Sequence, residues 1–439
     1  MKKRLSFVIF LISFSVFSQS YVALDTTDYI KRDIFLKKID NDFELLEKQI
    51  KKRYKGKLRK GIISSFNRIH KDISKNIKKK RLVFHDTFTS YIDSLSDVII
   101  KNNKDLIDEK IYVYVHKQNS PNALSLGRGI ILLNMGLFSL LENEQQLTSV
   151  LTHEIAHQLL NHTENTIVSR VKTETSKEKK QQVKRIKKKR YSTHSEAFSV
   201  LKNILYNNSK NRRKQEVKAD SLGFILYKNT KLSFNEYLQT LHLLKNYDSL
   251  PNVKVDSTVY RKFFDLPSQP FNNEWLTVED FKSYNYEHYN SKIDSDSLKS
   301  HPELDERIKY LKKTFSNDLD SSNNSSQQAS SSFEKLKEIA NQESIINLFY
   351  NEAYGLSIYS ILARLDENPE NAYYKKWLGI NFNKLYEAKK KYQYNRHVDK
   401  IVPNEQDRSY QQFLSFLWNL RLNEIKHIAE YYIPKKSED

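Results

Sequence analysis

The chain has 439 residues, and 73 Lys and Arg against 53 Asp and Glu give it a formal net charge of +20. Its hydrophobic content of 38% supports a packed core, while only 8 Gly and 8 Pro exclude collagen-like and low-complexity chains. The absence of Cys excludes disulfides, thiol catalysis and Cys-based zinc fingers, but not zinc held by His and carboxylates.

The N-terminus has the layout of a signal peptide. Lys2, Lys3 and Arg4 are charged, and residues 5–17 are apolar apart from three Ser. Ser18 and Ser20 then place small side chains at the two positions that a signal peptidase reads. The apolar run is shorter than the ~20 residues that a spanning helix needs. We therefore expect a signal peptide at 1–20 and an exported, periplasmic or secreted protein with no transmembrane helix in the mature chain. An uncleaved N-terminal membrane anchor is the alternative.

The following elements are predicted from the spacing of apolar residues. Apolar positions three and four apart predict helices, and β-branched runs predict short strands. The first predicted helices cover 28–80, 86–100 and 144–161. The predicted strands are 111–115 and 129–133, with a turn or loop at 120–123 between them.

A basic run occupies residues 177–190, where nine of fourteen residues are Lys or Arg. A solvated excursion is one interpretation, and the others are a patch for an anionic envelope surface or a flap that gates a cleft. Residues 197–206 and 212–227 have helical patterns again.

The segment 316–332 is rich in Ser and Asn and has no apolar periodicity, which predicts a flexible linker. It would separate a unit at 21–315 from a helical C-terminal domain at 333–439, whose role is open. Leu378 and Gly379 after a Pro-containing turn are similar to a tetratricopeptide helix. No second copy follows, so an ordinary helical domain is expected.

The decisive motif is His153-Glu154-Ile155-Ala156-His157, within the predicted helix 144–161. Residues four apart on a helix lie about 40° apart around its axis. Two imidazoles at this spacing can converge on one zinc ion at ~2.0–2.1 Å. Glu154 points toward the remaining coordination position, where a carboxylate can take a proton from the attacking water and pass it to the leaving amine.

A third ligand is expected 59 residues after His157, at Glu216. Glu216 would complete the two-His, one-Glu set of a catalytic zinc with one open position. Asp220 follows it by one helical turn and can fix the tautomer of a ligating His. On its own, Glu216 is also compatible with a solvated helix carboxylate.

The remaining histidines lack ligand spacing. His162 lies about 140° around the helix from His157, so we expect it to cap the helix C-terminus instead. His301 and Pro302 have the chemistry of a helix start. The alternative is that His301 or Arg307 reaches the site, to stabilise an oxyanion or to brace a carboxylate.

Together these pieces resemble the zinc metalloendopeptidase family that includes the CAAX prenyl protease and the HtpX-type heat-shock proteases. The likeness is to its soluble, exported branch and covers about 86–311. Four pieces stand in the family's order, namely residues 122–131, 144–157, 216–223 and 301–308.

The resemblance implies a mainly helical α+β fold with a gluzincin-type core and a small β-sheet. It implies one zinc per chain held by His153, His157 and Glu216, with Glu154 as general base. Other implied site residues are Asp220 and His301 as catalytic groups, Arg307 as support, and Asn122, Ala123, Gly129 and Ile130 at a substrate-binding edge strand that runs along 129–133.

The sequence departs from the family in two ways. The stretch between the two ligand helices is Lys-rich where many members are Gly-rich and apolar, which leaves the gating of the site open. The transmembrane helices of the best-known members have no counterpart, so prenylated substrates are not expected.

We therefore expect a zinc-dependent metalloendopeptidase of the cell envelope, acting on protein or peptide substrates in protein quality control. The competing hypothesis is an exported basic binding or chaperone-like module with a vestigial or latent metal site. A nucleic-acid partner is not expected, because the basic residues concentrate in one run and no nucleic-acid module is present.

Overall fold

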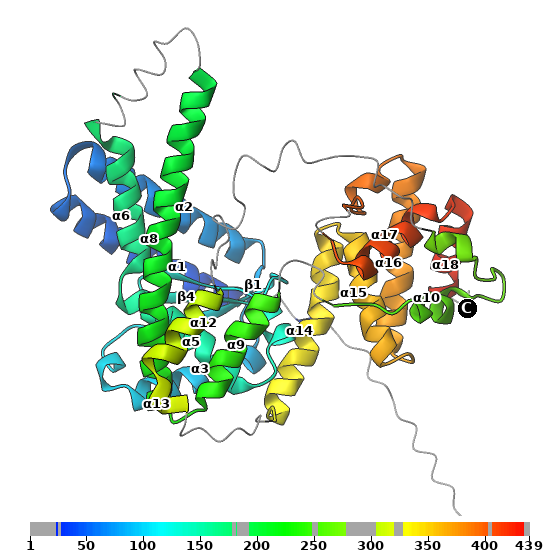
Figure 1. Ribbon diagram of the computed structural model, residues 1–439, viewed down its shortest axis with the longest axis horizontal. Coiled ribbons are helices and arrows are strands. Elements are labelled where there is room, and N and C mark those ends of the chain that lie inside the picture. Colours follow the sequence, from blue (N-terminus) through cyan, green and yellow to red (C-terminus); the bar gives the residue numbers. More distant parts are fainter. Residues whose placement is uncertain are drawn as a thin grey trace, which may run out of the picture.

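The computed structural model describes residues 23–24, 28–177, 181, 193–247, 253–277, 304–319, 328–402 and 406–433. It is mainly helical with one four-stranded sheet, which confirms the predicted α+β class. Figure 1 shows two parts side by side, one built around the sheet and one all-helical, with α14 between them. Among the described helices, none is both long enough and apolar enough to cross a bilayer.

The first part holds the sheet and the motif helices. Its helices are α1 (Tyr29–Arg53), α2 (Gly56–Lys78), α3 (Asp86–Asn102), α4 (Met135–Leu140), α5 (Glu144–Leu159), α6 (His162–Thr175), α8 (Thr193–Asn229), α9 (Phe234–Asn246), α12 (Leu304–Thr314) and α13 (Ser316–Leu319). The two helical patterns predicted at 197–206 and 212–227 are one continuous helix, α8.

The second part, here called the C-terminal bundle, is entirely helical. Its helices are α10 (Thr258–Phe264), α14 (Ser331–Tyr350), α15 (Tyr354–Glu367), α16 (Ala372–Lys390), α17 (Arg408–Asn419) and α18 (Leu422–Tyr432). Short 3-10 turns lie at Lys104–Leu106 in the first part, and at Asn273–Leu276 and Tyr394–Arg396 in the bundle.

The sheet consists of β1 (Leu82–Val83), β2 (Tyr112–His116), β3 (Ala123–Gly127) and β4 (Ile130–Asn134), in the order β1-β2-β4-β3. β2 and β4 are parallel, and β3 runs antiparallel to β4. The predicted edge strand at 129–133 is therefore wrong, because β4 lies inside the sheet and β3 forms its edge. Ile130 is 1% exposed between two strands, so no peptide can pair along it. The apolar run of β4 is typical of a strand buried on both faces.

The β3–β4 turn explains the glycines that flank Arg128. Gly127, Arg128 and Gly129 all have positive φ, at 84°, 58° and 81°. A Cβ at Gly129 would lie 1.8 Å from the carbonyl oxygen of Lys110, so no other residue fits there. The backbone conformation and the close carbonyl therefore both require glycine at position 129.

Packing divides the chain differently from the boundary predicted at residue 315. Val259, Phe263 and Trp275 precede that boundary, yet they belong to the core of the C-terminal bundle. Phe333 and Leu336 follow it, yet they pack with the sheet. The chain thus passes from the sheet-containing part to the bundle and back before α14 joins the two parts.

Some predictions fall on parts of the chain that the structure does not describe. They are the signal peptide at 1–20, the basic run apart from Lys177 and Gln181, and His301. The predicted linker at 316–332 is helical at both described ends, in α13 and at the start of α14, and residues 320–327 between them lie outside the described residues.

Candidate metal centre and active site

Helix α5 carries the motif and is anchored at its N-terminal end. Asn143 caps it by accepting a hydrogen bond from the amide of Gln146 at 3.1 Å. Glu236 of α9, itself buried, accepts hydrogen bonds from the side chains of Asn143 and Gln146, each at 2.9 Å. This network fixes the start of α5 against α9, so the motif lies on a rigid element.

Helix α8 crosses α5 where α8 has a glycine. A Cβ on Gly223 would lie 2.9 Å from the Cα of His153, closer than real side chains come. Gly223 therefore allows the two helices to approach each other closely. This approach brings Glu216 and Asp220, two and one turns earlier on α8, level with the histidines of α5.

Three side chains converge on one point between these helices. Nε2 of His153 lies 3.0 Å from Nε2 of His157 and 3.5 Å from Oε2 of Glu216. Nε2 of His157 lies 3.6 Å from Oε1 of Glu216. One ligand atom from each residue lies within 4.8 Å of the other two. Two imidazole nitrogens and a carboxylate oxygen are a donor set that zinc takes in catalytic sites, so the cluster fits that ion.

Each histidine also has a neighbour behind it. Nδ1 of His153 lies 3.0 Å from Oδ1 of Asp220. Nδ1 of His157 lies 3.0 Å from Nδ1 of His162, which is 6% exposed. A neutral imidazole that offers Nε2 to a metal carries its proton on Nδ1, so both neighbours are placed to receive that proton as a hydrogen bond.

The predicted role of His162 as the C-terminal cap of the motif helix is wrong. Helix α5 ends at Leu159, and Asn161 has a left-handed backbone with φ of 51°. His162 is therefore the first residue of the next helix, α6, which turns its ring back toward His157. The argument from angular spacing failed because it assumed that one helix continues past Leu159.

Arg307 braces both carboxylates on α8. Its Nε and Nη2 donate to the two carboxylate oxygens of Asp220, each at 2.6 Å, and its Nη1 lies 3.2 Å from Oε2 of Glu216. Arg307 and Asp220 are 4% and 0% exposed. Burial alone would raise the pKa of Asp220, but the Arg307 guanidinium outweighs burial and lowers that pKa to about 2. Asp220 is therefore a carboxylate at neutral pH.

The electrostatics of the cluster favour one added cation. Burial opposes a charge on His153, but the carboxylates of Asp220 and Glu216 outweigh burial and raise the pKa of His153 to about 10. Burial and the nearby His153 lower the pKa of His157 to about 3. Without a metal, the carboxylates of Asp220 and Glu216 therefore stabilise a positive charge on the His153 ring. The same negative charges favour a metal ion bound between the ligand atoms.

Glu154 opens onto a small cavity of about 40 Å³ beside the cluster. Asn122 and Ala123, at the start of the edge strand, line this cavity together with His153 and Arg307. Its other walls are mainly apolar and include Leu137, Val150, Leu241 and Leu244. The cavity thus places the edge of the sheet, the motif carboxylate and an apolar recess together.

Residues 89–315, just over half of the chain, match the sequence profile of Peptidase family M48. The chain belongs to this family. It has no match among the curated proteins. As an M48 member the chain is a metallopeptidase, which hydrolyses peptide bonds, and zinc is its cofactor.

The structure brings together most of the residues that the sequence singled out. His153, His157, Glu216, Asp220 and Arg307 meet in one buried cluster. Asn122 and Ala123 lie beside it, whereas Ile130 is buried in the sheet and Gly129 lies in the β3–β4 turn.

Sequence reasoning missed two residues, His162 and Gly223. The signal for His162 was a third histidine close behind the motif. It could be interpreted only with the knowledge that the helix ends at Leu159. A lone glycine inside a helical pattern was the signal for Gly223.

Proposed function

We propose that His153, His157 and Glu216 hold the catalytic zinc of an M48 endopeptidase and that Glu154 is its general base. The observation that carries this proposal is the convergence of three ligand atoms within 4.8 Å, beside a cavity that Glu154 shares with the edge of the sheet. This location matters because Glu154 can act as a general base only if it lies beside both the metal ligands and the strand edge where a peptide binds.

In this proposal, bound zinc supplies a Lewis acid that acidifies water and polarises the scissile carbonyl. Glu154 takes a proton from the attacking water and delivers it to the departing amide nitrogen. Asp220 and His162 hold the rings of His153 and His157 in the orientation that turns each Nε2 toward the cluster. Arg307 keeps Asp220 charged and limits the movement of Glu216.

The substrate lies extended along β3, whose only partner strand in the described part of the sheet is β4. A peptide that adds a strand there bonds mainly through its backbone, which tolerates many sequences. Asn122 and Ala123 flank the scissile bond, and the adjoining apolar cavity takes one small apolar side chain. His301 would assist from the segment that precedes α12.

We further propose that the enzyme acts in the cell envelope on misfolded or unassembled proteins. The signal-peptide layout of residues 1–20 supports the location, with the N-terminal anchor as its alternative. Tolerant pairing along β3 supports a broad substrate range. The basic run at 177–190 would keep the enzyme near anionic envelope surfaces.

The test compares casein cleavage by the zinc-loaded wild type and Glu154→Gln, with zinc content measured in both proteins. Removing a general base should lower cleavage by a factor of about 10² to 10⁴ while one zinc per chain remains. Glu174→Gln, the same exchange at an exposed site on α6, should cleave like the wild type. Casein binding without cleavage in the zinc-loaded wild type would instead favour the chaperone-like alternative.

A further inference from the structure

A second, larger cleft of about 410 Å³ opens at the far end of β3 from Glu154. His157 lines this cleft and His153 lines the small apolar cavity, so the two spaces adjoin different ligands of the metal centre. Gly127, at the end of β3, forms part of its floor. A peptide laid along the edge strand would therefore pass through both spaces.

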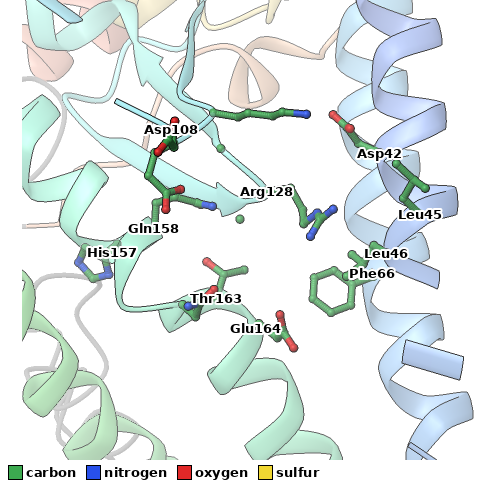
Figure 2. Close-up of a pocket in the computed structure, with 15 residues that line it drawn as sticks. Asp42, Leu45, Leu46, Phe66, Asp108, Arg128, His157, Gln158, Thr163 and Glu164 are labelled. Carbon is green, nitrogen blue, oxygen red and sulfur yellow. The ribbon is translucent and has the colours of Figure 1, made fainter. Parts of the chain in front are cut away.

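The outer wall of this cleft comes from α1 and α2. Figure 2 shows Asp42 and Leu45 of α1 and Phe66 of α2 on the side of the cleft that faces Arg128 of the β3–β4 turn. Ile62 and Phe66 of α2 pack into one core with Ile167 and Val171 of α6, which fixes the wall in place. Both helices precede residue 89, so this wall lies outside the segment that matches the family.

The charge of the cleft is opposite to that of the chain. Four carboxylates line it against two cations, although the whole chain carries a net charge of +20. One of the four, Glu164, is paired with Arg53 at 3.1 Å, and the balance stays negative when this arginine is counted. The carboxylates are Asp42, Asp108, Glu109 and Glu164, and the cations are Lys110 and Arg128. The cleft also has an apolar surface, because Leu45 at its rim is 51% exposed.

The position of Glu154 fixes the direction of a bound peptide. A general base that hands its proton to the departing nitrogen must lie on the amine side of the scissile bond. Glu154 lines the small cavity and not the cleft, so the C-terminal half of the substrate runs toward Asn122 and Ala123. The N-terminal half then runs past His157 and Gly127 into the cleft, antiparallel to β3.

We propose that this cleft selects substrates with Lys or Arg shortly before the scissile bond. The aliphatic stem of such a side chain covers Leu45 while its charged head reaches Asp42, a division that long basic side chains favour. Acidic side chains meet the same carboxylates and are disfavoured. The inference rests on the proposed endopeptidase function and adds a substrate class to it.

The experiment digests a proteome-derived peptide library with the zinc-loaded full chain and maps every cleavage site by mass spectrometry. The readout is the ratio of Lys and Arg to Asp and Glu in the four residues before the cut, relative to the library. Wild type should enrich this ratio, and Asp42→Lys should lower it by about fivefold, the size of a partly exposed charge interaction. Glu44→Lys makes the same charge change on an exposed site of α1 outside the cleft and should match the wild type.

The outcomes separate the two proposals. Cleavage by wild type with no basic enrichment, or an equal shift in Asp42→Lys and Glu44→Lys, overturns the cleft assignment and leaves the endopeptidase intact. Absence of cleavage throughout the library overturns both. Raising the ionic strength should shrink the enrichment in wild type, because salt screens these exposed charges.

Discussion

The metal centre and helices α15–α18 of the C-terminal bundle bury opposite kinds of side chain. His153, Glu154, Glu216, Asp220 and Arg307 are each at most 9% exposed. In the described residues between 354 and 433, no charged side chain is buried to that degree. That part buries aromatic residues instead, including Tyr359, Phe382, Phe413 and Phe416.

This difference locates the chemistry of the molecule. Burying a charge is costly unless a partner compensates it, so a dense cluster of compensated buried charges is a candidate functional site. The aromatic core of the bundle gains stability from apolar burial and has no such cost. The buried charge of the first part therefore supports the proposed active site, and helices α15–α18 of the bundle offer no comparable cluster among their described residues.

The largest expected effect on stability is that of Arg307→Met. The variant leaves the carboxylates of Asp220 and Glu216 buried without their shared cation. Breaking a buried ion pair in this way costs about 3–5 kcal/mol of unfolding free energy. Urea denaturation of the zinc-free protein would measure it.

The matched control for this variant lies in the bundle. Arg364→Met removes an arginine that binds Glu367 at 3.3 Å and Asn341 at 2.9 Å near the surface. A partly exposed pair contributes about 0–1 kcal/mol, so this variant should be nearly neutral. Equal losses in the two variants would contradict the contrast between the regions.

The pH dependence of stability follows from the same pair. Arg307 lowers the pKa of Asp220 to about 2, below the ordinary value of 3.8. A depressed carboxyl pKa stabilises the folded state above about pH 4, and this contribution is lost as the pH falls toward 2. The difference in unfolding free energy between wild type and Arg307→Met should therefore shrink in acid. Urea denaturation at pH 7 and pH 3 would show whether that difference narrows.

A smaller effect is expected for His162→Phe, which keeps a ring at the start of α6 but removes the acceptor at Nδ1 of His157. Loss of such a partner typically weakens metal binding by about 10–100-fold. Competition against a zinc chelator would measure the change in Kd. His397→Phe, in the bundle, should leave the Kd unchanged. If the melting temperature of the zinc-free protein fell and the zinc Kd did not move, His162 would be only a packing residue.

The smallest effect should come from Tyr359→Phe in the bundle. The Tyr359 hydroxyl donates to the carbonyl oxygen of Val253 at 3.0 Å and lies 2.8 Å from Oγ of Ser409. Its loss should cost about 1 kcal/mol of unfolding free energy. Casein cleavage should stay at the wild-type rate, and a large fall in cleavage would show that the bundle acts on the active site.

The sequence predicted what local spacing determines. The motif on α5, the carboxylates one turn apart on α8 and the strands around β2 and β4 all follow from residue intervals. The edge position of β3 was missed because its small residues, Ala, Ser and Gly, give no strong strand signal.

Long-range packing left no such signal in the sequence. Nothing in residues 253–277 indicates that they pack in the bundle, since their partners lie about a hundred residues later. The close contact of Gly223 with His153 also depends on how two helices cross, which the spacing of residues does not encode.

The most direct test of the account is the zinc content of purified protein, measured by elemental analysis after reconstitution and removal of free metal. Wild type and Glu154→Gln should each hold one zinc per chain, because we propose Glu154 as the general base and not as a ligand. His153→Ala and Glu216→Ala should lose most of it. Full zinc occupancy in Glu216→Ala, or its loss in Glu154→Gln, would contradict the assignment of the metal centre.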